Sequence, residues 1–173
     1  MTTRSTYDHA ADAIVPHGGV LVDRNADDTT RTTFEERARV ADAPTIRLNS
    51  RELSDLEMIA CGALSPLTGF LGRADYERVV ADGRLASGLP WTIPVTMSAR
   101  AEVISRLRPG QPALLADPSG KLVGAIDVEE VFPYDKAREA RQVFGTEDLA
   151  HPAVAYLHDD MGERLVSGPI TLF

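Results

Sequence analysis

A histidine followed by two glycines, in the stretch PHGG at residues 16–19, is a pattern that could bind a ligand. Glycine loops bind phosphate when several backbone N–H groups converge at a helix start, which requires G-x-x-x-x-G-K-[ST] or G-x-G-x-x-G spacing. Neither spacing is present, and the apolar residues 20–22 that follow are typical of a strand. A turn with a structural His17 is the favoured interpretation, and anion binding or half of a metal site are the alternatives.

Other metal ligands are few and scattered. The histidines are His9, His17, His151 and His158, and none forms an H-x-x-H or H-x-x-x-H pair, so a metal site would require convergence in the fold. Cys61 is the only cysteine, which excludes an internal disulfide and a Cys-based zinc site. It lies in an apolar run, where we expect a buried, unreactive thiol rather than a nucleophile.

Two pairs of adjacent carboxylates, Glu129–Glu130 and Asp159–Asp160, suggest a metal site or acid–base catalysis. Neighbouring side chains on a strand point to opposite faces, and on a helix they do not stack, so such pairs rarely converge on one ion. Solvated charge is therefore the favoured reading. Ser65 has no G-x-S-x-G context, so a nucleophile elbow is not indicated.

The composition of the 173 residues, with 43% hydrophobic and 25% charged side chains, is that of a soluble globular domain. A formal net charge of -8 and the lack of a Lys/Arg run argue against nucleic acid as a partner. No stretch is apolar enough for a signal peptide or a membrane span, so we expect a cytoplasmic protein.

The first half of the chain is predicted to be mainly helical after a flexible N-terminal arm at residues 1–13. Helical spacing of apolar residues, with Ser50 as a cap and Gly62 as a stop, gives the clearest helix. The other predicted elements are a strand at 20–22, a helix at 34–41 stopped by Pro44, a half-buried strand at 45–48, and a helix at 74–82 ended by Gly83.

From residue 90 the apolar period changes from about 3.6 to 2 residues. Trp91, Ile93, Val95 and Met97 are predicted to share one face of a strand, which Pro94 places at an edge or a bulge. The other predicted elements are a short crossing segment at 102–107, two strands around a tight turn at 117–120, a helix at 135–144 closed by Gly145, and strands in the tail segments HPAVAYL and ERLVSGPITLF.

Helices mainly before strands suggest an α+β fold with an antiparallel, barrel-like sheet, in one domain that spans residues 14–173. No internal repeat or linker marks a second domain.

Four segments in one colinear series resemble the N-terminal region of ATP sulfurylase, or sulfate adenylyltransferase. They are PHGGVLVDR (16–24), LSDLEMIACGALSPLTGFLGRADYERVV (53–80), WTIPVTM (91–97) and AREARQVFGTEDLAHPAVAYL (137–157). The resemblance implies a PUA-like domain, a small mixed β-barrel with peripheral helices. It also implies a link to the family reaction, in which the full-length enzyme uses ATP, sulfate and Mg²⁺ to form adenosine 5'-phosphosulfate and pyrophosphate.

The family's catalytic groups lie in its next domain, in Gln-x-Arg-Asn and His-x-x-His motifs. Neither Gln111 nor Gln142 is followed by Arg-Asn, and no His-x-x-His is present. No catalytic, cofactor-binding or metal-binding residue is therefore assigned to this chain. We expect it to act with a catalytic nucleotidyltransferase domain or chain, to lack activity alone, and to be a candidate homo-oligomer. The alternative is a free-standing PUA-like binding or regulatory module.

An apolar loop that breaks both periods is the candidate contact with that domain or with a partner. The candidate contact residues are Leu64, Ser65, Pro66, Leu67, Phe70 and Leu71. The alternative is that this loop packs on the barrel of its own chain.

Overall fold

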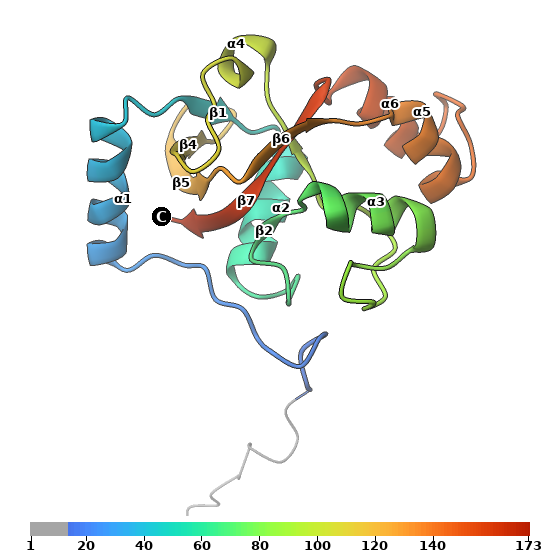
Figure 1. Ribbon diagram of the computed structural model, residues 1–173, viewed down its shortest axis with the longest axis horizontal. Helices are drawn as coiled ribbons and strands as arrows, with labels where there is room; N and C mark the ends of the chain where they lie inside the picture. The colour runs from blue at the N-terminus through green and yellow to red at the C-terminus, as the bar shows by residue number, and fades with distance from the viewer. Residues whose placement is uncertain (1–13) are drawn as a thin grey trace, which may run out of the picture.

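The computed structural model describes residues 14–173, and the expected flexible arm at residues 1–13 lies outside the described residues. These residues form a mixed seven-stranded sheet, curved into a half-barrel with helices around it (Figure 1). The α+β fold expected from the sequence is confirmed.

The sheet has the strand order β1-β4-β5-β7-β2, and β3 and β6 also pair with β7. β1 is parallel to β4, and the other pairs are antiparallel. The strands are β1 (Thr45–Arg47), β2 (Gly69–Phe70), β3 (Met97–Ser98), β4 (Pro112–Ala116), β5 (Leu122–Asp127), β6 (Glu130–Pro133) and β7 (Arg164–Leu172).

The last strand, β7, runs through the centre of the sheet (Figure 1). Its residues Leu165 and Val166 pair with β3 and β6 at the same time, so these two strands lie on opposite edges of β7. Beyond Gly168, the strand pairs with β5 through residues 170–172. Leu165, Val166 and Ile170 are fully buried, as expected for a strand covered on both faces.

Helices surround the sheet, and the α2 sequence shows why one of them forms where it does. The helices are α1 (Asp28–Val40), α2 (Ser50–Ala60), α3 (Arg73–Asp82), α4 (Ala101–Ile104), α5 (Lys136–Glu139), the π-helical segment η1 (Ala140–Phe144) and α6 (Pro152–Asp159). In α2, Leu56 and Ile59 are fully buried at helical spacing. Asn49 and Glu52 form a capping box at its start, so the cap precedes the predicted Ser50 by one residue.

Several other predictions are confirmed. The strand at 45–48 keeps its alternating burial, α3 ends at a left-handed Gly83, and β4 and β5 form the predicted hairpin. The helix predicted at 135–144 forms as α5 followed by η1 and ends at Gly145. The helix predicted at 34–41 also forms, but it begins earlier because the Asp27 side chain accepts a hydrogen bond from Thr30 N–H and caps it.

Three strand predictions are wrong. The segment HPAVAYL lies mostly in helix α6, because a short apolar run with a proline at the first helical position suits a helix as well as a strand. Only Met97 and Ser98 of the segment around Pro94 are in a strand, and Ile93 is exposed. The segment after the hairpin turn forms two strands, β5 and β6, rather than one.

The predicted strand at 20–22 is also absent. Val22 N–H donates to Ser65 Oγ at 3.0 Å, and Arg24 N–H donates to the Ala60 carbonyl at 2.9 Å. At residues 20–22 the backbone therefore lies against a loop, and it meets the sheet only further along, in a single bridge between Asn25 and Leu172 of β7.

Gly168 permits the close crossing at the centre of the sheet. Its φ of 144° is unfavourable for other residues, and a Cβ at this position would lie 1.9 Å from the Asp127 carbonyl oxygen. We expect Gly168→Ala to lower the free energy of unfolding by about 3 kcal/mol or more, from strain and overpacking together.

Gly88→Ala is the matched control, because Gly88 also has a positive φ but no atom lies within 4 Å of an added Cβ. It should cost only the backbone strain, about 1–2 kcal/mol. Urea denaturation of both variants measures the difference, and equal losses would contradict a steric role for Gly168.

Candidate functional site

The PHGG segment forms a turn, as predicted. Gly19 N–H donates to the Pro16 carbonyl at 2.8 Å, and Gly18 and Gly19 have φ values of 80° and 85°. The His17 ring is 5.9 Å from the Trp91 ring, and its Nε2 lies 2.9 Å from the Pro90 carbonyl oxygen. His17 therefore has a structural contact that fixes the turn against the loop after α3.

The other candidate ligands lie on separate elements. His151 precedes α6 and packs against Phe144 with ring centroids 5.4 Å apart, whereas His158 is exposed on α6. Glu130 accepts a hydrogen bond from Arg73 N–H at 2.8 Å, and Asp159–Asp160 is exposed at the end of α6. Within residues 14–173, no group of three or more His, Cys, Asp or Glu side chains could hold a metal ion.

The expectation of a buried Cys61 is wrong. Its thiol is exposed, and its Sγ lies 3.6 Å from the Met58 carbonyl oxygen at the end of α2. The apolar run that suggested burial is helical, so Ile59 and Ala60 face the core and the next residue points outward.

The apolar loop at 64–71 is largely covered by its own chain. Ser65, Leu67, Phe70 and Leu71 are buried, and Leu64 and Pro66 are half-buried. Phe70 belongs to β2, which pairs with β7. Packing on its own barrel thus accounts for most of this loop, and only its rim is open.

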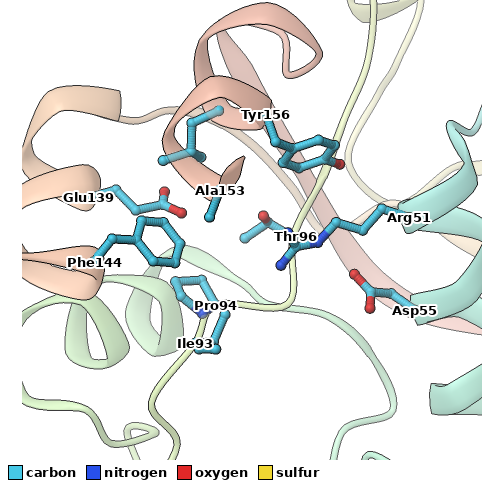
Figure 2. Close-up of a pocket in the computed structure, with 10 residues that line it drawn as sticks. Arg51, Asp55, Ile93, Pro94, Thr96, Glu139, Phe144, Ala153 and Tyr156 are labelled. Atoms are coloured by element: carbon cyan, nitrogen blue, oxygen red, sulfur yellow. The ribbon is translucent and has the colours of Figure 1, made fainter. Parts of the chain in front are cut away.

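A small polar pocket lies between α2, α5, η1, α6 and the segment before β3 (Figure 2). Arg51 and Asp55 reach it from α2, and Glu139 and Phe144 approach from the opposite side. The Arg51 guanidinium lies 4.9 Å from the centre of the Tyr156 ring. Five side chains with charge or hydrogen-bonding capacity, those of Arg51, Asp55, Thr96, Glu139 and Tyr156, are brought together from α2, α5, α6 and the segment before β3.

Burial controls the charge state of this pocket. Loss of solvation raises the pKa of Asp55 and Glu139, and the nearby Arg51 charge opposes this shift at both carboxyls. Burial also raises the pKa of the Tyr156 hydroxyl to about 12. Glu139 accepts a hydrogen bond of 2.8 Å from the Tyr76 hydroxyl, which satisfies one of its two oxygens.

The volume of the polar pocket limits its chemistry. About 10 Å³ is open, which is room for about one water molecule and no nucleotide. Asp55 and Glu139 are its only carboxyl groups, fewer than a metal site built from protein ligands alone would need. The arrangement suits a hydrated structural cluster that ties α2 to the helices near the C-terminus.

A larger groove of about 660 Å³ runs along β1. Arg47 and Arg100 line it together with Asp159 and Asp160, so it carries both signs of charge. The buried Glu52 lies at its base, where its two oxygens accept hydrogen bonds of 2.9 Å from Ser98 N–H and Asn49 N–H. This volume is within the usual range for ligand sites.

Sequence reasoning did not identify the polar pocket. Arg51 and Asp55 are four residues apart on a predicted helix, which places them on one face, and this spacing was the available signal. Glu139 and Tyr156 meet them only through the tertiary fold, for which no local pattern exists.

The comparisons with known proteins identify the family. The sequence model of the PUA-like domain matches residues 14–173. The chain belongs to the PUA-like domain family. A solved structure described as a hexameric APS kinase from Thiobacillus denitrificans shares this PUA-like fold, with a TM-score of 0.66 and 27% identity over 92% of this chain and 27% of the other.

Curated relatives of this PUA-like domain are sulfate adenylyltransferases. The protein from Synechococcus sp. is 45% identical over 94% of this chain and 41% of its own length. The protein from Symbiobacterium thermophilum is 48% identical over 94% of this chain and 40% of its own length. The PUA-like domain thus spans about two fifths of the relatives that it matches. None of the helices within residues 14–173 has the length and apolar character needed to cross a membrane.

The buried carboxyl of Glu139 generates a prediction about pH. Its pKa is raised by burial, so the stability associated with its neutral form is present at low pH and lost as the pH rises through the folded-state pKa. Glu139→Gln removes this loss of stability, because glutamine does not ionise, and its side-chain oxygen can still accept the hydrogen bond from the Tyr76 hydroxyl. We expect the Tm of the variant to match wild type near pH 4 and to exceed it by a few degrees at pH 8, measured by calorimetry.

Glu52→Gln is the matched comparison, since burial raises the Glu52 pKa as well. Each Glu52 oxygen accepts a backbone N–H, so a glutamine would place its NH₂ group against one of these donors. It should lose about 1–3 kcal/mol at pH 8. A Glu139→Gln variant that is also less stable at pH 8 would refute the role given to burial.

Proposed function

We propose that residues 14–173 form the N-terminal, non-catalytic domain of a sulfate adenylyltransferase. The observation that carries this proposal is the identity of 45–48% over 94% of the chain to enzymes of which it spans only about two fifths. The role is structural or one of interaction, and the catalytic nucleotidyltransferase part is the partner. The cytoplasmic location expected from the sequence belongs to the same proposal.

The chemistry of the relatives explains why this domain would be inactive alone. Sulfate is a poor nucleophile, so catalysis requires groups that hold it in line with the α-phosphate and neutralise charge on the leaving pyrophosphate. The sequence has neither a Gln-x-Arg-Asn nor a His-x-x-His motif. The polar pocket accommodates about one water, and its buried carboxyls would oppose a polyphosphate.

A binding or regulatory module is the second candidate function. The observation that favours it is the groove of about 660 Å³ along β1, which carries two arginines and two aspartates. Its mixed charge suits a zwitterionic ligand better than RNA, because a chain with a net charge of -8 repels a phosphate backbone. Salt-dependent RNA binding in a gel shift would support the RNA-binding form of this candidate.

The purified chain should show no sulfate adenylyltransferase activity. We expect turnover at background level when it is incubated with ATP, sulfate, Mg²⁺ and pyrophosphatase, because the groups for in-line attack are absent from its sequence. Phosphate release measures the outcome. The Symbiobacterium thermophilum relative is the positive control, and turnover above background by the purified chain would refute the non-catalytic assignment.

A further inference from the structure

An exposed apolar segment precedes α1 and carries four large aliphatic side chains within eight residues. Ile14 and Val15 have exposed fractions of 95% and 73%, and Val20 and Leu21 are each 65% exposed. Single exposed aliphatic residues are common, whereas two exposed aliphatic pairs in one short segment are a candidate interaction surface.

The segment is anchored to the domain. Hydrogen bonds join His17 to Pro90, Val22 N–H to Ser65 Oγ, and Arg24 N–H to the Ala60 carbonyl. In Figure 1 this segment is the blue chain that leads into α1. The segment is therefore held at His17 and just beyond its end, which reduces the entropy cost of binding.

A groove of about 370 Å³ lies beside this segment. Gly18 joins the two, because an added Cβ would lie 3.1 Å from Pro66 Cγ, and Pro66 lines the groove. Phe70 and Leu85 contribute apolar walls, and Pro169 comes from β7. We call the exposed segment 14–21 and this groove together the arm face.

The charged side chains of the groove are both acidic. Asp75 Oδ1 accepts a hydrogen bond of 2.7 Å from Ala86 N–H, so its charge is partly satisfied. Glu129 is exposed and makes no salt bridge to any of the residues 14–173. A partner that places a basic side chain beside Glu129, next to apolar residues, would complement both properties of the groove.

We propose that the arm face binds the part of a sulfate adenylyltransferase that this chain does not span, through an apolar segment that carries a Lys or Arg opposite Glu129. This inference rests on the proposed function. More than half the length of each relative lies outside the matched region, so the relatives contain a covalently linked partner of sufficient size. A second copy of the chain offers only carboxylates from this groove, which makes it the poorer occupant.

The test uses the remaining part of the Symbiobacterium thermophilum relative, expressed without the region that matches this chain, and measures its binding to the full chain by calorimetry. Val20→Asp and Leu21→Asp should each weaken binding about tenfold or more, because they place a charge in an apolar contact. Glu129→Lys should weaken it severalfold, with a smaller effect at high salt. Val40→Asp is the control, because Val40 is 83% exposed on α1 outside the arm face, and its affinity should match wild type.

A second measurement uses a fusion protein. In it, this chain replaces the matching N-terminal region of the Symbiobacterium thermophilum relative, and sulfate adenylyltransferase activity and Tm are measured for the wild-type fusion and the four variants. The binding role of the arm face would be refuted if the fusion is active, if its arm-face variants have the same Tm as Val40→Asp, and if all variants bind with the same affinity in calorimetry. The proposed function would then remain intact. A folded but inactive wild-type fusion, together with no binding, would overturn the proposed function itself.

Discussion

The pairing of β7 is the constraint on which the rest of the structure depends. One strand of nine residues, near the C-terminal end of the sequence, pairs with β2, β3, β5 and β6. These partners come from residues 69 to 133, so the sheet closes only after long chain segments have been brought together. Such non-local pairing is expected to make folding slow compared with that of a helical bundle of the same length.

The close approach of β2, β7 and the end of β5 at the centre of the sheet explains the glycines of β2 and β7. A Cβ on Gly69 would lie 1.9 Å from the Gly168 carbonyl oxygen, and one on Gly168 would meet the Asp127 carbonyl at the same distance. Three backbones therefore approach one another within a few residues. This close approach lets β7 pair with strands on both of its edges. It also determines where the loop at 64–71 packs.

Local signals predicted much of this fold. Caps and apolar spacing identified α2 and α3, and the DPSG turn identified the β4–β5 hairpin, because each signal acts within a few residues. The errors have a common cause. Residues 20–22 and the segment HPAVAYL are short apolar runs, whose structure depends on which distant element covers them.

The polar pocket could not be predicted from local sequence signals, for a related reason. Arg51, Glu139 and Tyr156 are far apart in the sequence and meet only because α2, α5 and α6 pack around the same end of the sheet. The raised pKa values of Glu139 and Tyr156 arise from burial, which no local sequence pattern reports. The absence of a recognisable catalytic motif was, in contrast, readable directly from the sequence.

The apolar loop and the arm face show how the fold redistributes exposed surface. The sequence left open whether the loop at 64–71 contacts a partner or packs on its own barrel, and pairing of Phe70 with β7 and packing of Leu67 and Leu71 bury most of it. Gly18 in the segment at 14–21 lies beside Pro66 of this loop, and the aliphatic side chains of the segment stay largely exposed. Leaving a CH₂ group in water forgoes about 0.8 kcal/mol of burial energy, so an anchored apolar segment is unfavourable unless something covers it. The anchoring hydrogen bonds hold this segment at the surface, where binding of a partner would recover that energy.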